Sequence, residues 1–357
     1  MNLTMYYLII LLLALIGNSA MAKTPPSGTC SWESKNGLET KTFVGSINLG
    51  TVFIPRDAPI GSIIGSDWID IPIDTSIMKQ LTCFNRASIR GSIIGSLVND
   101  DINVASNRVP SGSIFTTNIP GVGISFKTSD LKLSQESGSV PFFPFVVRLG
   151  FLSTYSIGYI PVSVILIKIG EIPMGSHALN SNSEIITDGG GVIEKFKVSA
   201  NITRSECVLP NSSKQISVPM GNVPISEIEY PSIDGSELKD FQIPLVDCIS
   251  GSYPKVPGNY YTSSFAYLSI GGNSGSSILD FDKGLLGLNS KSTASGIAIQ
   301  ILRKGDSNPM RLGSAVPIKR VTDGGMSLDF QARYVKIKEN PTPGTANASA
   351  TFTITYK

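Results

Sequence analysis

Apolar and polar residues alternate with a period of two in several short stretches of this sequence. The alternation is clearest near the C-terminus, where Phe352, Ile354 and Tyr356 are separated by threonines, and it recurs in residues 69–74. Successive side chains of a β-strand point to opposite faces, so this pattern predicts strands with one buried face. No window of the sequence shows a helical period of comparable length. The pattern therefore predicts an all-β protein.

Composition refines the prediction of an all-β fold. The 357 residues include 35 glycines and 22 prolines, which interrupt the stretches rich in Ile, Val, Thr and Ser. Such punctuation predicts short strands joined by many turns, as in β-sandwiches. A domain spans roughly 100–200 residues, so the length predicts two β-sandwich domains.

The charge balance excludes one class of partner. The sequence has 29 Lys and Arg residues against 27 Asp and Glu residues, which gives a net charge of +2, and only 16% of its residues are charged. A nucleic-acid-binding domain concentrates positive charge on one face, and a chain disordered by its charge needs a large net charge. The sequence therefore predicts a folded protein with no nucleic-acid partner.

The first residues predict export. Residues 8–16 are an unbroken apolar run, and Ala20-Met21-Ala22 has the small-x-small form of a cleavage site, so we predict a signal peptide over residues 1–22. No Lys or Arg precedes the apolar run, which leaves an N-terminal membrane anchor as the alternative. The run is shorter than the ~20 residues that a membrane-spanning helix needs, and this length favours the signal peptide.

Four cysteines in an exported chain predict disulfides, and four cysteines allow three pairings. We predict Cys30–Cys83 and Cys207–Cys248, because each of these pairs then lies within one of the two expected domains. A zinc site is the competing interpretation of four cysteines. The sequence has no CxxC motif and no histidine near the cysteines, which argues against zinc.

A linker is predicted between the two domains. Residues 179–191 are rich in Gly, Asn and Ser, which disfavour packed structure. The boundaries then give a first domain over residues 23–178 and a second over residues 192–357. The two halves also repeat the same order of cysteine and glycine motifs, which indicates a common sandwich architecture.

A set of short motifs gives the second half a family resemblance. The motifs are Val198-x-Ala200-x-Ile202, Met220-Gly221-Asn222-Val223, Phe241-Gln242-Ile243-Pro244-Leu245, Gly296-Ile297-Ala298-Ile299-Gln300, Phe330-Gln331-Ala332-Arg333-Tyr334-Val335, Pro343-Gly344-x-Ala346-Asn347-Ala348 and Phe352-Thr353-Ile354-Thr355-Tyr356. On these motifs, residues 192–357 resemble the pilin domain of chaperone–usher fimbrial subunits, which is an immunoglobulin-like sandwich that lacks its last strand.

The first half has a thinner set of motifs, which includes Gly61-Ser62-Ile63-Ile64, Ile119-Pro120-Gly121-Val122-Gly123-Ile124 and the strand that begins at Val164. On these motifs, it is similar to the receptor-binding domain of two-domain tip adhesins. The arrangement is closest to the type 3 fimbrial adhesins. It departs from the mannose-binding type 1 adhesins, which place a Phe at the mature N-terminus, whereas this chain would begin with Lys23.

The resemblance implies partners and a docking groove. A periplasmic chaperone, an outer-membrane usher and an adjacent subunit that donates a β-strand are the implied partners, and the mature protein is expected at the fimbrium tip on the cell surface. Phe352, Ile354 and Tyr356 are expected to form one wall of the strand-acceptor groove. The alternative is that these three residues belong to the core of a complete sandwich.

The tip position is argued from the segment before the first cysteine. A subunit within a fibre donates an alternating apolar strand, whereas residues 23–29 are short and contain Pro25 and Pro26, which lack backbone donors. The sequence therefore predicts a tip adhesin that accepts a strand without donating one. The alternatives are a structural adaptor pilin without a receptor and an exported hydrolase.

Candidate receptor-binding residues come from the first half. Trp68 is flanked by Asp67 and Asp70, and an aromatic face beside carboxylates suits a host glycan or an extracellular-matrix receptor; Asn99 and Asp101 are further candidates. The alternative places Trp68 in the core or on an edge strand. The chain has one histidine and no GxSxG motif, so we predict neither an enzyme, a cofactor nor a metal site.

Overall fold

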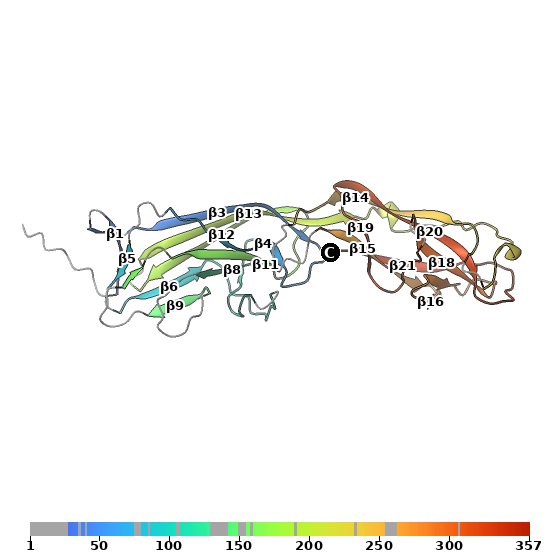
Figure 1. The fold of residues 1–357 in the computed structure, drawn as a ribbon, viewed down its shortest axis with the longest axis horizontal. Coiled ribbons are helices and arrows are strands. Elements are labelled where there is room, and N and C mark those ends of the chain that lie inside the picture. Colours follow the sequence, from blue (N-terminus) through green and yellow to red (C-terminus); the bar gives the residue numbers. More distant parts are fainter. Residues whose placement is uncertain are drawn as a thin grey trace, which may run out of the picture.

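The computed structural model confirms the all-β prediction. It describes residues 28–34, 37–39, 41–74, 80–84, 86–104, 108–128, 142–148, 155–157, 160–188, 191–231, 234–253, 263–305 and 308–357. These residues form strands and two short 3₁₀ helices, η2 (Asn211–Ser213) and η3 (Ile225–Glu227), with no α-helix among them. Two β-rich parts lie end to end in an elongated molecule, and the C-terminus lies where they meet (Figure 1).

The N-terminal part has strands from three sheets. Its strands are β1 (Cys30–Ser34), β2 (Gly37–Glu39), β3 (Phe43–Pro55), β4 (Ile63–Asp70), β5 (Gln80–Cys83), β6 (Ser88–Ile93), β7 (Phe115–Thr116), β8 (Val122–Thr128), β9 (Phe145–Arg148), β10 (Tyr155–Ile157), β11 (Val162–Lys168) and β12 (Ser176–Thr187). Two four-stranded sheets have the orders β10-β5-β1-β2 and β4-β11-β8-β7. The third is the N-terminal end of a sheet that crosses the whole molecule.

One strand, β13 (Val192–Val208), belongs to both parts of the molecule. It pairs antiparallel with β12 and parallel with β3 as far as Ser205, and then with β14 (Lys239–Ile249) through Glu206 and Val208. Ile202 packs in the N-terminal core and Cys207 in the C-terminal core, so the change of hydrophobic core falls within this strand. The two parts are thus joined by continuous β-structure (Figure 1).

The expected linker over residues 179–191 is wrong, because most of it is strand β12. Leu179, Ser181, Ser183 and Ile185 are buried in alternation with more exposed neighbours, and β12 pairs with both β13 and β6. Two of the buried positions are serines, and serine is also common in linkers. The segment therefore has the composition of a linker although it is a central strand. Residues 192–205, expected to begin the second domain, pair with β12 and β3 of the N-terminal part.

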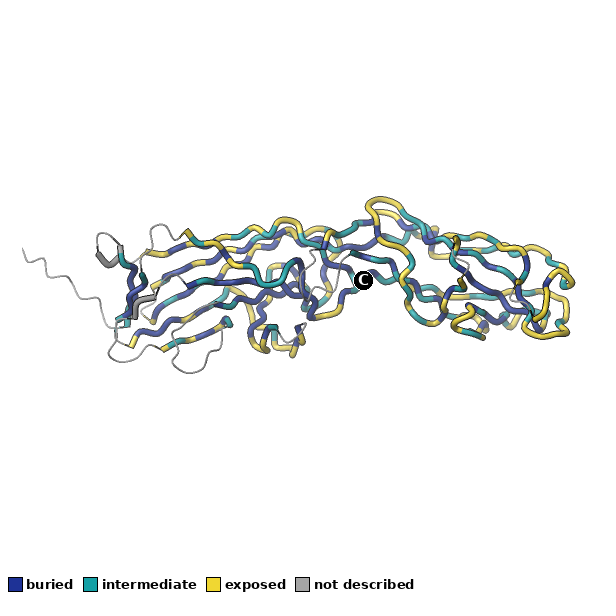
Figure 2. Tube along the Cα trace, viewed as in Figure 1, coloured by how far each residue is buried: buried dark blue, intermediate teal, exposed yellow. Residues whose placement is uncertain are grey.

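The C-terminal part is a two-layer sandwich. One layer continues β13 and β14 with β20 (Gly324–Lys336), β18 (Ile297–Arg303), β17 (Leu285–Gly287) and β16 (Ile278–Asp280). The other layer has β19 (Val316–Arg320), β15 (Phe265–Asn273) and β21 (Ser349–Tyr356), in that order. Apolar side chains such as Leu268, Leu328 and Phe330 are buried between the layers, where the dark interior runs along the molecule in Figure 2.

Both predicted disulfides are confirmed. Cys30 and Cys83 lie opposite each other on β1 and β5, and Cys207 joins Cys248 across β13 and β14. No cysteine in the described part of the chain is free. Each bridge therefore ties neighbouring strands within one part of the molecule, as the pairing prediction requires.

The predicted signal peptide over residues 1–22 lies outside the described residues, as do residues 23–27 of the segment before Cys30. Among the residues that the structure describes, no helix is long and apolar enough to cross a membrane.

Candidate functional site

Strand β21 is the edge of its sheet and pairs only with β15 among the described strands. Lys357 and Phe265 exchange two backbone hydrogen bonds, of 2.7 and 3.1 Å, just beyond the end of β21. Hydrogen-bonded residues alternate along an antiparallel pair, so the backbone groups of Ala350, Phe352, Ile354 and Tyr356 point away from β15. This outer side of β21 is an open sheet edge over part of its length.

An apolar groove of about 940 Å³ lies beside this open edge. Residues 346–352 line one side, and Leu209 with residues 214–221 lines the other. The floor consists of core side chains from both layers of the sandwich, including Ile243, Ile270, Leu286, Ile299, Ile301 and Tyr334. Residues 209–221 contain η2 but no β-strand, so no strand of the described chain fills the position next to β21 here.

The groove continues beyond the start of β21. A second hollow of about 500 Å³ shares Gly221, Tyr334, Ala346 and Asn347 with the first. It extends past Ile228 and Ile297 to residues 342–345. The two hollows together form one long channel that exposes the core between residues 209–228 and the C-terminal segment.

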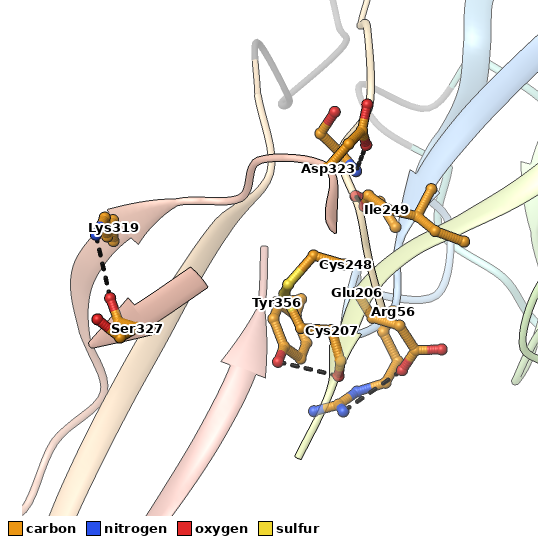
Figure 3. Close-up of a disulfide and its surroundings, with 11 residues drawn as sticks. Arg56, Glu206, Cys207, Cys248, Ile249, Lys319, Asp323, Ser327 and Tyr356 are labelled. Atoms are coloured by element: carbon orange, nitrogen blue, oxygen red, sulfur yellow. Dashed lines mark hydrogen bonds and ion pairs between the residues drawn. A yellow bond between two sulfur atoms is a disulfide. The ribbon is translucent and has the colours of Figure 1, made fainter. Parts of the chain in front are cut away.

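The three predicted groove residues lie in different surroundings. Phe352 lines the groove, whereas Ile354 and Tyr356 are absent from its lining and pack on the core further along β21. Tyr356 is 1% exposed, and its hydroxyl donates a 3.1 Å hydrogen bond to the Cys207 carbonyl (Figure 3). Burial raises the pKa of the Tyr356 phenol to about 12. Tyr356 therefore marks the closed end of the strand and not the groove wall.

The turn after β3 closes that end of β21. The Arg56 guanidinium donates a 2.8 Å hydrogen bond to the Ile354 carbonyl and lies over the Tyr356 ring, 4.7 Å from its centroid. The Asp57 carboxylate accepts a 2.7 Å bond from the Tyr356 amide, and the Asp57 amide donates a 3.1 Å bond to the Tyr356 carbonyl. The N-terminal part thus occupies the outer edge at the last residues of β21.

Further charged groups support this turn. The Lys168 ammonium, on a largely buried side chain, donates a 2.6 Å hydrogen bond to the Arg56 carbonyl. Arg56 also lies 3.6 Å from the Glu206 carboxylate, to which Arg204 donates a 2.7 Å bond (Figure 3 shows Arg56 and Glu206). Charges that are partly removed from water are stable only when paired, and this network pairs them. Nothing in the sequence pattern pointed to Arg56 or Asp57.

Strand β4 carries three of the predicted receptor residues, Asp67, Trp68 and Asp70. Two basic residues that the sequence did not predict, Arg108 and Lys127, lie beside them. Trp68 is half-buried, with the Lys127 ammonium 4.4 Å from its ring centroid. Asp67 forms an ion pair with Arg108, and Asp70 accepts a 2.6 Å hydrogen bond from Ser163. Burial lowers the pKa of Lys127, and Asp67 and Asp70 oppose that shift. The result is an aromatic ring on β4 beside the Lys127 ammonium of β8, next to the Asp67–Arg108 ion pair.

Asn99 and Asp101 belong to a segment whose apolar residues Val98 and Ile102 pack in the same hydrophobic cluster as Trp68. Asn99 and Asp101 are exposed in this segment after β6, and Asp101 accepts a hydrogen bond from Ser111. In the described part of the chain neither residue has a hydrogen bond or ion pair with Asp67, Trp68 or Asp70. The described residues also include no group of three His, Cys, Asp or Glu side chains that could hold a metal ion.

The core of the N-terminal part contains one buried carboxyl, Glu194. The side chain is fully buried, and one carboxyl oxygen accepts a 3.0 Å hydrogen bond from the Ile160 amide. The other oxygen has no hydrogen-bond partner among the described residues. Burial raises the pKa of Glu194 to about 8, against the opposing effect of the Ile160 bond, so this carboxyl is largely neutral at pH 7.

Comparison with known proteins identifies the class of the C-terminal part. Residues 196–357 match the family model described as fimbrial protein. The chain is 27% identical over 195 residues to a type-1 fimbrial protein subunit of Serratia marcescens, a match that covers 52% of this chain and 97% of that protein. The family-model match falls on the C-terminal part of this chain, and both matches bear out the resemblance to fimbrial subunits.

Two further matches are to fimbrial adhesins. The chain is 32% identical over 82 residues to the F17c-G fimbrial adhesin of Escherichia coli, which covers 20% of this chain and 24% of that adhesin. The chain thus spans about a quarter of the length of that relative. The crystal structure of the CupB6 tip adhesin from Pseudomonas aeruginosa is 15% identical, with a TM-score of 0.34, over 91% of this chain and 94% of that one.

Proposed function

We propose that this chain is a non-enzymatic fimbrial adhesin. Its C-terminal part joins a fibre by accepting a β-strand from an adjacent subunit, and its N-terminal part binds a receptor on a host or other surface. The observation that carries the proposal is the apolar groove beside the open edge of β21, within the residues that match the fimbrial protein family. An incomplete sandwich in a subunit that assembles into fibres is a docking site for another chain's strand.

The groove has the two features that strand addition requires. The outward backbone groups of Ala350 and Phe352 offer main-chain hydrogen bonds to an incoming strand. The floor offers apolar side chains to every second residue of that strand, because side chains alternate between faces. The occupant that fits is therefore an extended segment with apolar residues at alternate positions.

An open edge above an apolar groove promotes aggregation unless it is covered. For this reason we infer that a periplasmic chaperone covers the groove after export, and that an adjacent subunit replaces the chaperone at the outer-membrane usher. The finished protein then belongs at the cell surface, in the fimbrium. Pro25 and Pro26, which lack backbone donors and so disfavour a donated strand, support a place at the tip.

The proposed receptor-binding surface is the group around Trp68. An aromatic ring carrying a cation on one face, with carboxylates and an arginine beside it, offers both stacking and directed hydrogen bonds. Asp67, Asp70, Arg108 and Lys127 are the polar members of this surface. Glycans and extended segments of matrix proteins are the ligands that such a surface suits.

A peptide-binding experiment on the full chain tests strand acceptance. The probe is a synthetic peptide of alternating valine and threonine, about as long as β21, and the readout is the thermal unfolding midpoint. We expect the peptide to raise the midpoint, because a ligand that binds only the folded state stabilises it. Phe352→Asp should abolish the rise, since the change places a charge on the groove wall.

Thr353→Asp is the matched control for Phe352→Asp. Thr353 neighbours Phe352 on β21 but is exposed on the opposite face, so this variant should retain the peptide-dependent rise. If Phe352→Asp responds to the peptide as fully as Thr353→Asp does, the groove is not the binding site and the strand-acceptor proposal fails.

Binding of the full chain to a glycan array and to immobilised extracellular-matrix proteins tests the receptor proposal. We expect binding to one of these surfaces that Trp68→Ala weakens by at least about tenfold, on the scale of a lost stacking and cation–π contact. Phe281→Ala removes an exposed aromatic ring from the C-terminal part and is the control. Peptide acceptance without binding to any surface would favour a structural adaptor subunit.

A further inference from the structure

The outer edge of β21 is open to a partner strand only as far as Phe352. Ala350 and Phe352 direct their backbone groups into the open groove. Two residues further along, the Ile354 carbonyl is bonded to Arg56, and at Tyr356 both backbone groups are bonded to Asp57. The same strand edge is therefore available at one end and occupied at the other.

The Arg56–Asp57 turn stands where the backbone of an incoming strand would continue. Neighbouring strands lie about 4.7–4.9 Å apart, with hydrogen bonds directly between them. Asp57 makes those bonds to Tyr356 itself, through its amide and its carboxylate. A strand that paired with Tyr356 would have to displace the turn.

The turn is held from several sides. The Arg56 amide donates a 3.1 Å bond to the Ser205 carbonyl on β13, and the Lys168 ammonium donates to the Arg56 carbonyl from β11. The Arg56 guanidinium also pairs with the Asp57 carboxylate at 2.9 Å and stacks on the buried Tyr356 ring. Displacing Arg56 and Asp57 would leave several partly buried charges without partners, which is unfavourable.

At the opposite end, the Ala346 carbonyl accepts a 2.8 Å hydrogen bond from the Tyr334 hydroxyl, which leaves its second lone pair for an incoming strand. There the channel continues past Ala346 and Asn347 to residues 342–345, with Ile228 and Ile297 beneath it. An incoming strand can thus extend in this direction over further apolar floor. The groove is open at one end and blocked at the other.

We propose that the Arg56–Asp57 turn is an end stop that fixes the register of the incoming strand. The proposal rests on strand acceptance by the same groove. The incoming segment, an extended alternating strand of an adjacent fimbrial subunit, pairs with β21 up to Phe352 and ends before Ile354, while its other end runs toward residues 342–345. The N-terminal part of this chain thereby decides which residues of the partner enter the groove of the C-terminal part.

Three peptides added to the full chain test the end stop. The core probe is the alternating valine–threonine peptide, and the other two carry one further valine–threonine pair at the N-terminal or the C-terminal end. Extension toward residues 342–345 should tighten binding by about fivefold, the scale of one additional net hydrogen bond. Extension toward Arg56 should leave the dissociation constant unchanged within about twofold. This asymmetry in the unaltered chain needs no substitution.

Substitution of the turn gives the second arm of the test. In Arg56→Ala/Asp57→Ala, both extensions should tighten binding, because the outer edge at Ile354 and Tyr356 becomes available. Asp57→Ala alone, which retains the Arg56 stack on Tyr356, should give a partial gain. Arg311→Ala removes an exposed arginine paired with Asp282 in the C-terminal part and should retain the asymmetry.

The outcomes separate the end stop from strand acceptance. If both extensions tighten binding to the unaltered chain equally, or if the double variant retains the asymmetry, the end stop is wrong while strand acceptance stands. If none of the three peptides binds, strand acceptance itself fails.

Discussion

Strand β11 in the N-terminal part and strand β21 in the C-terminal part differ in what surrounds them. Every residue of β11 is buried: β4 and β8 pair with its two edges, and a hydrophobic cluster covers each of its faces. β21 has β15 on one side only, and Phe352 and Ile354 remain partly exposed although they face the core. The comparison teaches that β11 has a partner on both edges within its own chain, whereas β21 keeps one edge open over part of its length among the described strands.

The largest expected effect comes from placing a charge in each of these strands. Leu166→Asp on β11 should destabilise the full chain by at least about 4 kcal/mol, because an unpaired charge would be buried between two strands. Phe352→Asp should cost about 1–2 kcal/mol without peptide, because its carboxylate can reach water in the groove. Urea unfolding measures both changes. Equal losses would remove the contrast between a complete and an incomplete sheet.

Removal of the disulfides probes the two parts separately. The bridges join cysteines 53 and 41 residues apart, and the chain-entropy model assigns about 4 kcal/mol to each. Cys207→Ser/Cys248→Ser should lower the stability of the C-terminal part, and Cys30→Ser/Cys83→Ser that of the N-terminal part. Hydrogen exchange measured segment by segment shows which part of the molecule loses stability in each variant. A Cys207–Cys248 removal that destabilises only residues before 200 would contradict this assignment.

The buried Glu194 carboxyl should make the stability of the N-terminal part depend on pH. The folded pKa of Glu194, about 8, is above its ordinary value of 4.5, so folding favours the protonated carboxyl. The stabilisation is fully present below pH 4.5 and is lost as the pH rises through about 8, at a slope near 1.4 kcal/mol per pH unit. Glu194→Gln should flatten this slope. A variant with the same pH dependence as the unaltered chain would show that Glu194 does not titrate as described.

The sequence predicted the features that follow from local pattern. Alternation at Phe352, Ile354 and Tyr356 identified a half-buried last strand, and the pairing of four cysteines followed from the expected division into two parts. The family resemblance rested on motifs within residues 192–357, where the fimbrial protein model also matches. Alternation, the positions of the cysteines and short motifs, all readable along the sequence, were sufficient for these predictions.

The features that the sequence could not predict depend on distant contacts. Ser181 and Ser183 are polar, yet pairing with β13 and the strand's other neighbours buries them, so a central strand resembled a linker. Arg108 reaches Asp67, and Lys127 reaches Trp68, from segments far along the chain. Arg56 reaches Tyr356 across 300 positions of sequence (356 − 56), and no periodicity within either segment encodes that contact.

Amide hydrogen exchange along β21, with and without the alternating valine–threonine peptide, tests the central claim most directly. The account predicts that the Phe352 amide exchanges readily in the full chain alone and slows by on the order of a hundredfold when peptide fills the groove. The Tyr356 amide, already bonded to Asp57, should be protected in both states. A Phe352 amide that is fully protected before peptide is added, or unaffected by saturating peptide, would contradict the claim that this sandwich lacks a strand that another chain supplies.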